Sequence, residues 1–304
     1  MTSATPHRHR RSRRKLAIAV TVPATLVTGL AVTLTGVGSA SAGVTTPSAA
    51  GLPKPDHIVV VMMENHAFSQ IIGSKDAPYL NSLAENGALL TNSYGITHPS
   101  QPNYFAVFSG STQKITGDGC YKVGSMTAAN LASELIAAKK TWGSYNESLP
   151  KEGSTTCKDG KYAQKHNPWF AFKNVPADSG HTFAQFPTDF AQLPAVSFVV
   201  PNLCSDMHDC SVGTGDGWIK KNLDGYATWA KTHNSLLIVT YDEDNKQSGN
   251  HIPTLVFGQP VKAGSTSSAS YNHYDVLRTV EDLAGLSTHA GKAAQATDVT
   301  GIWN

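Results

Sequence analysis

The sequence predicts an α/β fold, a single domain with a mostly parallel central sheet, helices on both faces and a loop-rich insertion. Three short apolar runs rich in β-branched residues, at 58–63, 195–200 and 236–241, are typical of strands buried on both faces. Stretches with helical spacing lie between and after them, an alternation that favours parallel strands joined by helices. With 304 residues, 40% of them hydrophobic, the chain can bury a sizeable core.

In the first half of the chain, strand 58–63 precedes two predicted helices. Apolar side chains recur at helical spacing over 78–86, which predicts the first helix. Residues 127–140 predict the second, with Thr127 at its expected start. The segment from about 141 to 190 is rich in Gly, Lys, Pro and aromatic residues and has weak periodicity, so we expect it to form the insertion or a cap.

The second half continues the alternation of strands and helices. A helix is expected over 216–232, between the strands at 195–200 and 236–241. A shorter strand at 253–257 follows, and a last helix over 275–284 places its apolar residues on one face.

The first 42 residues have the features of an export signal. Six Lys and Arg residues and no acidic residue lie in positions 1–15, an apolar run follows from Leu16 to Val37, and Ala40-Ser41-Ala42 supplies small residues for cleavage. The alternative is a retained membrane anchor, because the run approaches the ~20 residues that span a bilayer. We expect cleavage, a flexible lead at 43–56, a folded domain at 57–304 and a secreted, extracellular monomer without stable membrane insertion. The export route, general secretory or twin-arginine, stays open.

The chain without the signal is acidic and keeps all four cysteines. Subtracting the six basic residues of the signal from the 24 in the chain leaves 18 against 22 acidic residues, a net charge of −4. This balance gives no support for nucleic-acid binding. Four cysteines allow three pairings, of which near neighbours, Cys120 with Cys157 and Cys204 with Cys210, close most easily. A zinc site is the alternative, but it would need shorter spacings.

Polar residues with metal-binding side chains follow each predicted buried strand. Because ligands bind at the carboxyl ends of strands in open α/β sheets, these residues are expected at one edge. They are Glu64, Asn65 and His66 after the first strand, Asn202, Asp206, His208 and Asp209 after the second, and Asp242, Glu243 and Asp244 after the third, with His251 before the next strand. Each alone could be a helix cap or a solvated turn residue. Together they predict a divalent cation, Zn²⁺, Mn²⁺, Ca²⁺ or Mg²⁺.

Ser100 is the candidate nucleophile. It precedes the apolar stretch 104–108, which could form a helix, and a serine at a helix N-terminus faces backbone N–H groups that stabilise an anion. Coordination to a metal would activate its hydroxyl. An acyl-transfer triad is the alternative, but the G-x-S-x-G elbow is absent around Ser100.

The chain resembles the bacterial phosphoesterase family of acid phosphatases and non-haemolytic phospholipases C, within the alkaline phosphatase superfamily. Among its members are secreted acid phosphatases of mycobacterial type, some of which act on phosphatidylinositol 3-phosphate. The matching stretches are HIVVVMMENHAFSQIIG (57–73), THPSQPNYFAVFSG (97–110), KHNPW (165–169), PNLCSDMHDCSVGTGD (201–216), VTYDEDN (239–245), HIPTLVFG (251–258) and NHYDVLRTVEDLAG (272–285). They run through almost the whole chain after the signal.

The resemblance implies an alkaline-phosphatase-like fold and a role for each matching residue. Ser100 would form a phosphoseryl intermediate, Asn103 would hold a phosphoryl oxygen and His208 could act as general acid. Metal ligands would be Glu64, Asn65, Ser100, Asp242 and Glu243, with Asp206 and His251 at a second ion, where His208 is an alternative ligand. Whether one or two ions bind stays open. His166 and His273 match family histidines and are expected at the substrate.

The implied function is a metal-dependent acid phosphatase that hydrolyses small-molecule or lipid phosphate monoesters. The first alternative is a phosphodiesterase of the phospholipase C type, for which the chain is short. The second is a secreted binding protein without turnover, which would not need Ser100. Natural substrate, metal identity and pH optimum stay open.

Overall fold

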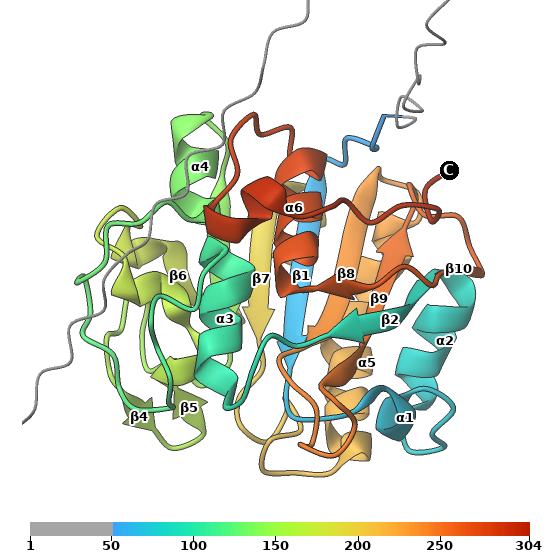
Figure 1. Ribbon diagram of the computed structural model, residues 1–304, viewed down its shortest axis with the longest axis horizontal. Coiled ribbons are helices and arrows are strands. Elements are labelled where there is room, and N and C mark those ends of the chain that lie inside the picture. Colours follow the sequence, from blue (N-terminus) through green and yellow to red (C-terminus); the bar gives the residue numbers. More distant parts are fainter. Residues whose placement is uncertain (1–50) are drawn as a thin grey trace, which may run out of the picture. The chain divides into compact units, whose positions relative to one another are not determined.

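The computed structural model describes residues 51–304, so the predicted signal and most of the predicted lead lie outside the described residues. A nine-stranded sheet carries helices on both faces (Figure 1), which confirms the predicted α/β class. Within the described part of the chain, no helix is long and apolar enough to cross a bilayer.

The central sheet is mixed but mostly parallel. Its order is β10-β2-β9-β8-β1-β7-β3-β6, and β11 also pairs with β2. The strands are β1 (His57–Met63), β2 (Ala88–Tyr94), β3 (Trp142–Asn146), β6 (Gly180–Thr182), β7 (Val196–Val200), β8 (Ser235–Tyr241), β9 (His251–Gly258), β10 (Ser265–Ser267) and β11 (Tyr271–Asn272). Only β9 is antiparallel to its neighbours, β2 and β8. It therefore begins at the edge where β1, β7 and β8 end.

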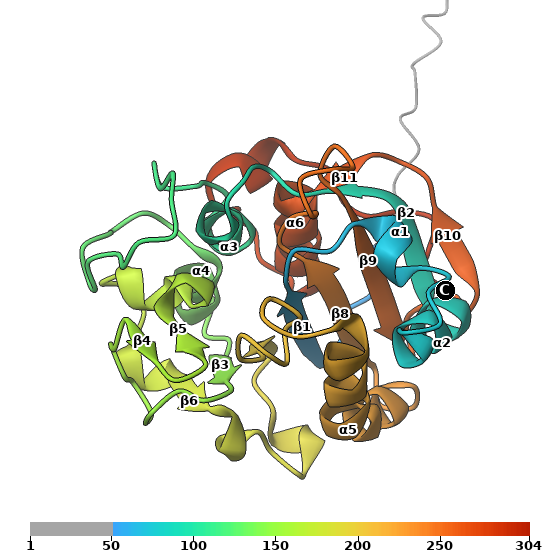
Figure 2. The same ribbon diagram turned by 90° about the horizontal axis from the view of Figure 1, so that it is seen from below.

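Helices of the described residues cover both faces of the sheet, as Figure 2 shows from below. They are α1 (Phe68–Ile71), α2 (Pro78–Asn86), α3 (Ser100–Ser109), α4 (Leu131–Ala137), α5 (Val212–Ala230) and α6 (His273–Leu283). Side chains of α3, α4 and α6 pack with Val60 of β1 in one core, and those of α1, α2 and α5 pack with Val61 in the other. Alternate residues of β1 thus fill both cores, which explains why its sequence is apolar throughout.

Most predicted elements are present with shifted ends. The helix expected over 78–86 is α2. The helix expected over 127–140 is much shorter, because Asn130 and not Thr127 caps it by accepting the Ser133 N–H at 2.9 Å. Helix α5 begins four residues before the expected start, after the cap residue Ser211.

The predicted insertion at 141–190 is only partly separate from the sheet. It contains β3 and β6, which extend the main sheet beyond β7. The remainder is the hairpin of β4 (Lys158–Asp159) and β5 (Tyr162–Ala163) with short 3₁₀ helices. These cover Gln164–His166, Pro168–Ala171, Ala177–Ser179, Phe183–Gln185 and Phe190–Gln192, and another lies at Gly291–Gln295. Strand β2 was also not predicted from the sequence.

Candidate active site

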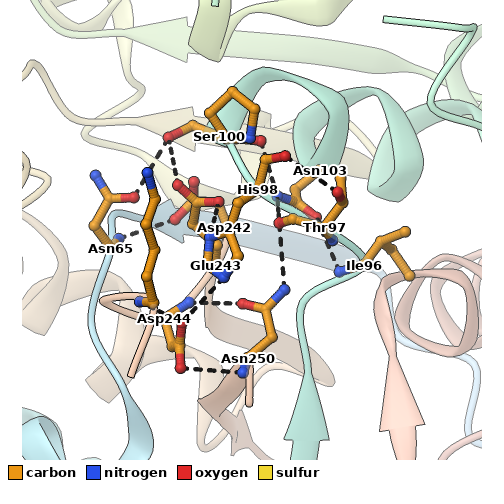
Figure 3. Close-up of polar contacts among 12 residues, drawn as sticks. Asn65, Ile96, Thr97, His98, Ser100, Asn103, Asp242, Glu243, Asp244 and Asn250 are labelled. Atoms are coloured by element: carbon orange, nitrogen blue, oxygen red, sulfur yellow. Dashed lines mark hydrogen bonds and ion pairs between the residues drawn. The ribbon is translucent and has the colours of Figure 1, made fainter. Parts of the chain in front are cut away.

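Ser100 is the first residue of α3 and contacts residues that directly follow the parallel strands β1 and β8. Its Oγ is 2.8 Å from Glu64 Oε2, 3.3 Å from Glu243 Oε1 and 3.4 Å from Asn65 Oδ1. The side chain is buried, and Figure 3 shows Asn65 and Glu243 beside it. A single hydroxyl is therefore surrounded by acceptor oxygens that two different strands supply.

The end of β1 positions Glu64 and Asn65. Asn65 has a left-handed backbone with φ of 55°, a conformation that asparagine tolerates better than most residues. Its backbone N–H donates to Asp242 Oδ1 at 2.9 Å. This bond ties the turn after β1 to the turn after β8, so the predicted metal ligands of the two turns are adjacent.

Asp242 and Glu243 are buried carboxyl groups with strongly perturbed acidity. Burial raises the pKa of Asp242 well above its usual range, and the charges of Glu64 and Glu243 add to the effect. Burial and the charges of Glu64 and Asp118 raise the pKa of Glu243 to about 8. Such clusters of like charge are typical of functional sites.

His166 lies behind the ligand cluster. It is fully buried, with Nε2 3.0 Å from Glu64 Oε1 and Nδ1 3.1 Å from Asp206 Oδ2, and its ring stacks on Tyr104. Burial lowers the pKa of His166, but the charge of Glu64 and hydrogen bonds to Asp206 and Glu64 raise it to about 9. Burial by itself would raise the pKa of Glu64. The charge of His166 and its hydrogen bond outweigh burial and lower the pKa to about 2. His166 therefore lies between two carboxylates, and its expected contact with the substrate stays a prediction.

His273, also expected at the substrate, contacts the backbone. Its Nε2 donates to the carbonyl oxygen of Asp242 at 2.6 Å, and the ring is fully buried at the start of α6. Burial lowers its pKa to about 4, so the ring is neutral at pH 7. His273 thus positions the turn that carries Asp242.

His251 and Asn103 both bond to backbone groups. His251 Nε2 donates to the Thr91 carbonyl oxygen at 3.0 Å, and its ring stacks on Phe68 with centroids 4.7 Å apart, so it does not face the carboxylates. Asn103 Oδ1 accepts the N–H groups of Ile96 and Thr97, and its Nδ2 donates to the Thr97 carbonyl oxygen (Figure 3). Asn103 thus fixes the loop before α3, and its expected role toward a phosphoryl oxygen stays a prediction.

The segment after β7 places Asp206 and His208 on the other side of His166. Asp206 is fully buried and accepts the His208 N–H at 2.8 Å. The His208 ring is partly exposed and contacts Asp209 and Lys165. Among the described residues His208 has no hydrogen bond to Ser100, and its role as general acid stays a prediction.

Three polar residues near Ser100 were not singled out from sequence. His98 contacts Glu243 and Asp244 through its two ring nitrogens (Figure 3). Asp118 accepts the N–H of Gln101 at 3.0 Å and pairs with Lys165 at 3.1 Å. His98 stands two residues before Ser100, a signal available in the sequence, whereas the pairing of Asp118 with Lys165 depends on tertiary structure.

The oxygen atoms around Ser100 fit a hard divalent cation in chemical type. Carboxylate, amide and hydroxyl oxygens are present, and the buried Asp242 Oδ2 has no hydrogen-bond partner among the described residues. Within residues 51–304, no three His, Cys, Asp or Glu side chains already form a metal-binding group. The oxygens converge on the serine hydroxyl, and a cation would offset the charge of this cluster.

Both predicted disulfides are confirmed. Cys120 pairs with Cys157, and Cys204 pairs with Cys210. The second bond closes the short loop that carries Asp206 and His208.

Comparison with known proteins identifies the family. The model of the phosphoesterase family matches residues 73–287. The chain belongs to the phosphoesterase family. This family match and the relatives described next confirm the predicted enzyme class, a hydrolase of phosphoric monoesters.

Two relatives and one solved structure illustrate the similarity. A phosphatidylinositol-3-phosphatase of Mycobacterium tuberculosis is 46% identical over 84% of this chain and 85% of its own length. A phosphate-repressible acid phosphatase of Penicillium chrysogenum is 28% identical over 76% of this chain but only 59% of its own length. A protein of the alkaline phosphatase superfamily from Vibrio parahaemolyticus shares the fold, with a TM-score of 0.59 and 15% identity over 83% of this chain and 71% of its own.

Proposed function

We propose that this phosphoesterase is an exported, metal-dependent phosphatase that uses Ser100 as a covalent nucleophile. The observation that carries the proposal is the buried Ser100 hydroxyl at the start of α3, within 3.4 Å of Glu64, Asn65 and Glu243. A merely structural serine does not need this concentration of acidic groups. The two disulfides and the signal-like first 42 residues support export.

In the proposed reaction, Ser100 Oγ attacks the phosphorus atom in line with the leaving oxygen. The bond from Oγ to phosphorus forms, the ester bond to the alcohol breaks, and the leaving alcohol takes up the proton that the Ser100 hydroxyl gives up. Glu64 Oε2, 2.8 Å from Oγ, accepts the hydroxyl hydrogen bond and orients the nucleophile. Water then hydrolyses the phosphoseryl group and releases phosphate.

The N-terminus of α3 supports the same step. Backbone N–H groups of the first turn carry partial positive charge, which favours the negative charge that develops on the phosphoryl oxygens. When bound by Glu64, Asn65, Asp242 and Glu243, a divalent cation would lower the pKa of the Ser100 hydroxyl and neutralise phosphoryl charge. His166 and His273 hold Glu64 and Asp242 in place for this task.

The substrate class is proposed from the relatives. Because the mycobacterial relative is named a phosphatidylinositol-3-phosphatase and matches 85% of its own length, a phosphoinositide monoester is the first substrate to test. Acid phosphatase relatives favour a broader range of monoesters, including small molecules.

The test compares Ser100→Ala with Ser109→Ala, a substitution at the other end of the same helix. Removing a covalent nucleophile should lower kcat for p-nitrophenyl phosphate by about 10³-fold or more. The Ser109 variant should keep most of the activity, because its hydroxyl bonds only to Phe105 and its neighbours. Thermal melting of both proteins checks folding. Near-normal turnover by Ser100→Ala would contradict the covalent mechanism.

A further inference from the structure

Lys165 is the one lysine of residues 51–304 that does not lie at an exposed position. Its side chain is 14% exposed, whereas every other lysine in this part of the chain is exposed. Burying a charged group is costly unless the group has partners. The one arginine in the same range, Arg278, pairs with Asp282 in α6 and is not available to the candidate site. A largely buried cation beside that site therefore needs a reason.

The ammonium group of Lys165 has two partners. Lys165 Nζ is 3.1 Å from Asp118 Oδ2 and 3.2 Å from His208 Nε2. Because an ammonium group donates and cannot accept, His208 Nε2 is the acceptor, and its Nδ1 donates to Asp209 at 2.8 Å. An ammonium group has three N–H donors, so one N–H of Lys165 has no partner among residues 51–304. This donor is available to a ligand.

Asp118 connects Lys165 with the start of α3. Its Oδ1 accepts the N–H of Gln101, the residue after Ser100, at 3.0 Å. The next residue, Pro102, has no backbone N–H. Neither of the two residues after Ser100 therefore offers a free backbone donor to an anion. The start of α3 alone gives a phosphate few hydrogen bonds, and a side-chain donor beside it would add to them.

A second chain of contacts runs through His166, the neighbour of Lys165 in sequence. His166 Nε2 is 3.0 Å from Glu64, and Glu64 accepts the Ser100 hydroxyl at 2.8 Å. Burial lowers the pKa of Lys165, but the charges of Glu64 and Asp118 outweigh burial and raise it above its usual value. The ammonium group is therefore charged at neutral pH, and it lies close enough to Glu64 to respond to its charge.

The ion pair of Lys161 and Asp209 belongs to the outer part of the same polar network. Lys161 Nζ is 2.8 Å from Asp209 Oδ2, and the two side chains are 50% and 36% exposed. Solvent weakens the interaction of such a pair with more distant charges. Lys161 thus offsets the charge of Asp209, and Lys165 is left as the charged donor beside the site.

We infer that Lys165 is a catalytic residue whose ammonium group donates a hydrogen bond to a non-bridging oxygen of the phosphoryl group at Ser100. Asp118 and His208 are the positioning residues that hold this ammonium group in place. The acidic groups around Ser100 repel a phosphate dianion, and Lys165 offsets this repulsion. A cation that is fixed before the reaction stabilises the developing charge without reorganisation. The inference rests on the proposed function, because it requires the phosphate to react at Ser100.

Two lysines of one segment provide a matched test. Lys165→Met removes the charge and the donor but keeps most of the length of the side chain, and Lys161→Met makes the same change at the exposed ion pair. Both are compared with the parent protein, saturated with Mn²⁺. One readout is kcat/KM for p-nitrophenyl phosphate and for acetyl phosphate. The other, independent of turnover, is the dissociation constant of inorganic phosphate from calorimetry.

Lys165→Met should lower kcat/KM by about 10²-fold, the loss typical of removing one donor to a developing oxyanion. The two substrates should lose equally, because they share the phosphoryl group and differ in the leaving group. Inorganic phosphate should bind about tenfold more weakly, as expected for loss of a hydrogen bond from a charged group. Lys161→Met should change each value by less than about twofold, since an exposed ion pair contributes little.

The affinity for Mn²⁺ separates this role from damage to the site. Lys165→Met should bind Mn²⁺ no more weakly than the parent, because it removes positive charge near Glu64 and no oxygen ligand. Lys165→Arg should recover part of the lost activity, since it restores a charged donor. If Lys165→Met fails to fold, Lys165→Gln, which keeps a donor for Asp118, provides the same comparison. Weaker Mn²⁺ binding in step with the loss of activity would show that Lys165 only supports the site, and would overturn the inference.

Two further outcomes would overturn the inference and leave the proposed function intact. One is an equal change for Lys165→Met and Lys161→Met, in kcat/KM or in phosphate binding. The other is a loss confined to p-nitrophenyl phosphate, which would place Lys165 at the leaving group. A parent protein that hydrolyses neither ester would overturn the proposed function itself.

Discussion

At the scale of single residues, the candidate site depends on side chains whose partners are other protein groups. His166 separates two buried carboxylates, His273 holds the backbone of Asp242, and Asn103 fixes the loop before Ser100. Removing one partner from a buried ionic contact leaves an uncompensated charge, which is far more costly than losing a surface pair. Residues that need not contact the substrate are therefore required to hold Ser100 and its neighbours in position.

The first residue-scale prediction concerns the cation. Glu64→Gln and Asp242→Asn should each weaken Mn²⁺ binding by at least about tenfold, because each removes charge from the same oxygen cluster. Calorimetric titration of chelated protein measures this, with the exposed Glu85→Gln as control. Chelation should abolish phosphatase activity and a divalent ion should restore it. Full activity after metal loss, verified by elemental analysis, would remove the basis for metal dependence.

The second residue-scale prediction concerns Glu281, which is fully buried in α6. Burial, with the charges of Glu134 and Asp282, raises its pKa from 4.5 to about 8. Between pH 4.5 and 8 the folded state keeps this proton and the unfolded state does not, so stability falls as pH rises through that window.

Glu281→Gln should remove this pH dependence, because the amide oxygen can still accept the Ala290 N–H. The variant should gain up to a few kcal/mol at pH 8 and little at pH 5. Urea denaturation at the two pH values measures the difference, with Glu85→Gln as control. An equal change at both pH values would show that the carboxyl group of Glu281 is not protonated in the folded protein.

At the scale of elements, the errors of the sequence analysis share one cause. Helix α4 was predicted to start at Thr127, but Asn130 caps it and also bonds to Asn174, 44 residues away. Likewise β3 lies in a segment without periodicity, and its strand conformation comes from pairing with β7. The start of α4 and the strand conformation of β3 both involve contacts between distant segments. A local sequence pattern carries no information about such contacts.

This difference gives the element-scale prediction. Asn130→Ala should destabilise the protein by about 2 kcal/mol, at the upper end for a helix cap, because the buried side chain loses its tertiary bond too. Thr127→Ala should be close to neutral, since Thr127 is exposed and outside the helix. Chemical denaturation of the two variants measures both values. A larger effect for Thr127→Ala would mean that the predicted helix start was right.

At the scale of the whole molecule, the sequence predicted which segments meet and was less accurate about side-chain direction. The acidic turns after β1 and β8 and the start of α3 come together as expected, because parallel strands place their carboxyl ends on one edge. His251 reaches this edge too, since β9 is antiparallel, but its ring stacks between Phe68 and Tyr94. Strand order thus fixes the neighbourhood of a residue, and side-chain packing fixes its partner.

The disulfides give a prediction at this scale. Their sequence separations are 37 for Cys120–Cys157 and 6 for Cys204–Cys210, which correspond to about 4 and about 2 kcal/mol of loop-closure stabilisation. Cys120→Ser/Cys157→Ser should therefore lose more stability. Cys204→Ser/Cys210→Ser should lose more activity on acetyl phosphate, because that loop carries Asp206 and His208. Melting temperatures and kcat distinguish the pair, and the reverse ranking would contradict the assignment.

The two borders of the sheet have a consequence for how copies of the chain meet. Strands β6 and β10 end the sheet on opposite sides, and each has only three residues. A long unpaired edge would expose a row of backbone N–H and C=O groups on which a second chain could add a strand and begin to aggregate. Because the long apolar strands β1, β7 and β8 lie inside the sheet, their backbone groups are already paired with neighbours. The arrangement that gathers the catalytic candidates in the middle of the sheet therefore also protects its most aggregation-prone segments.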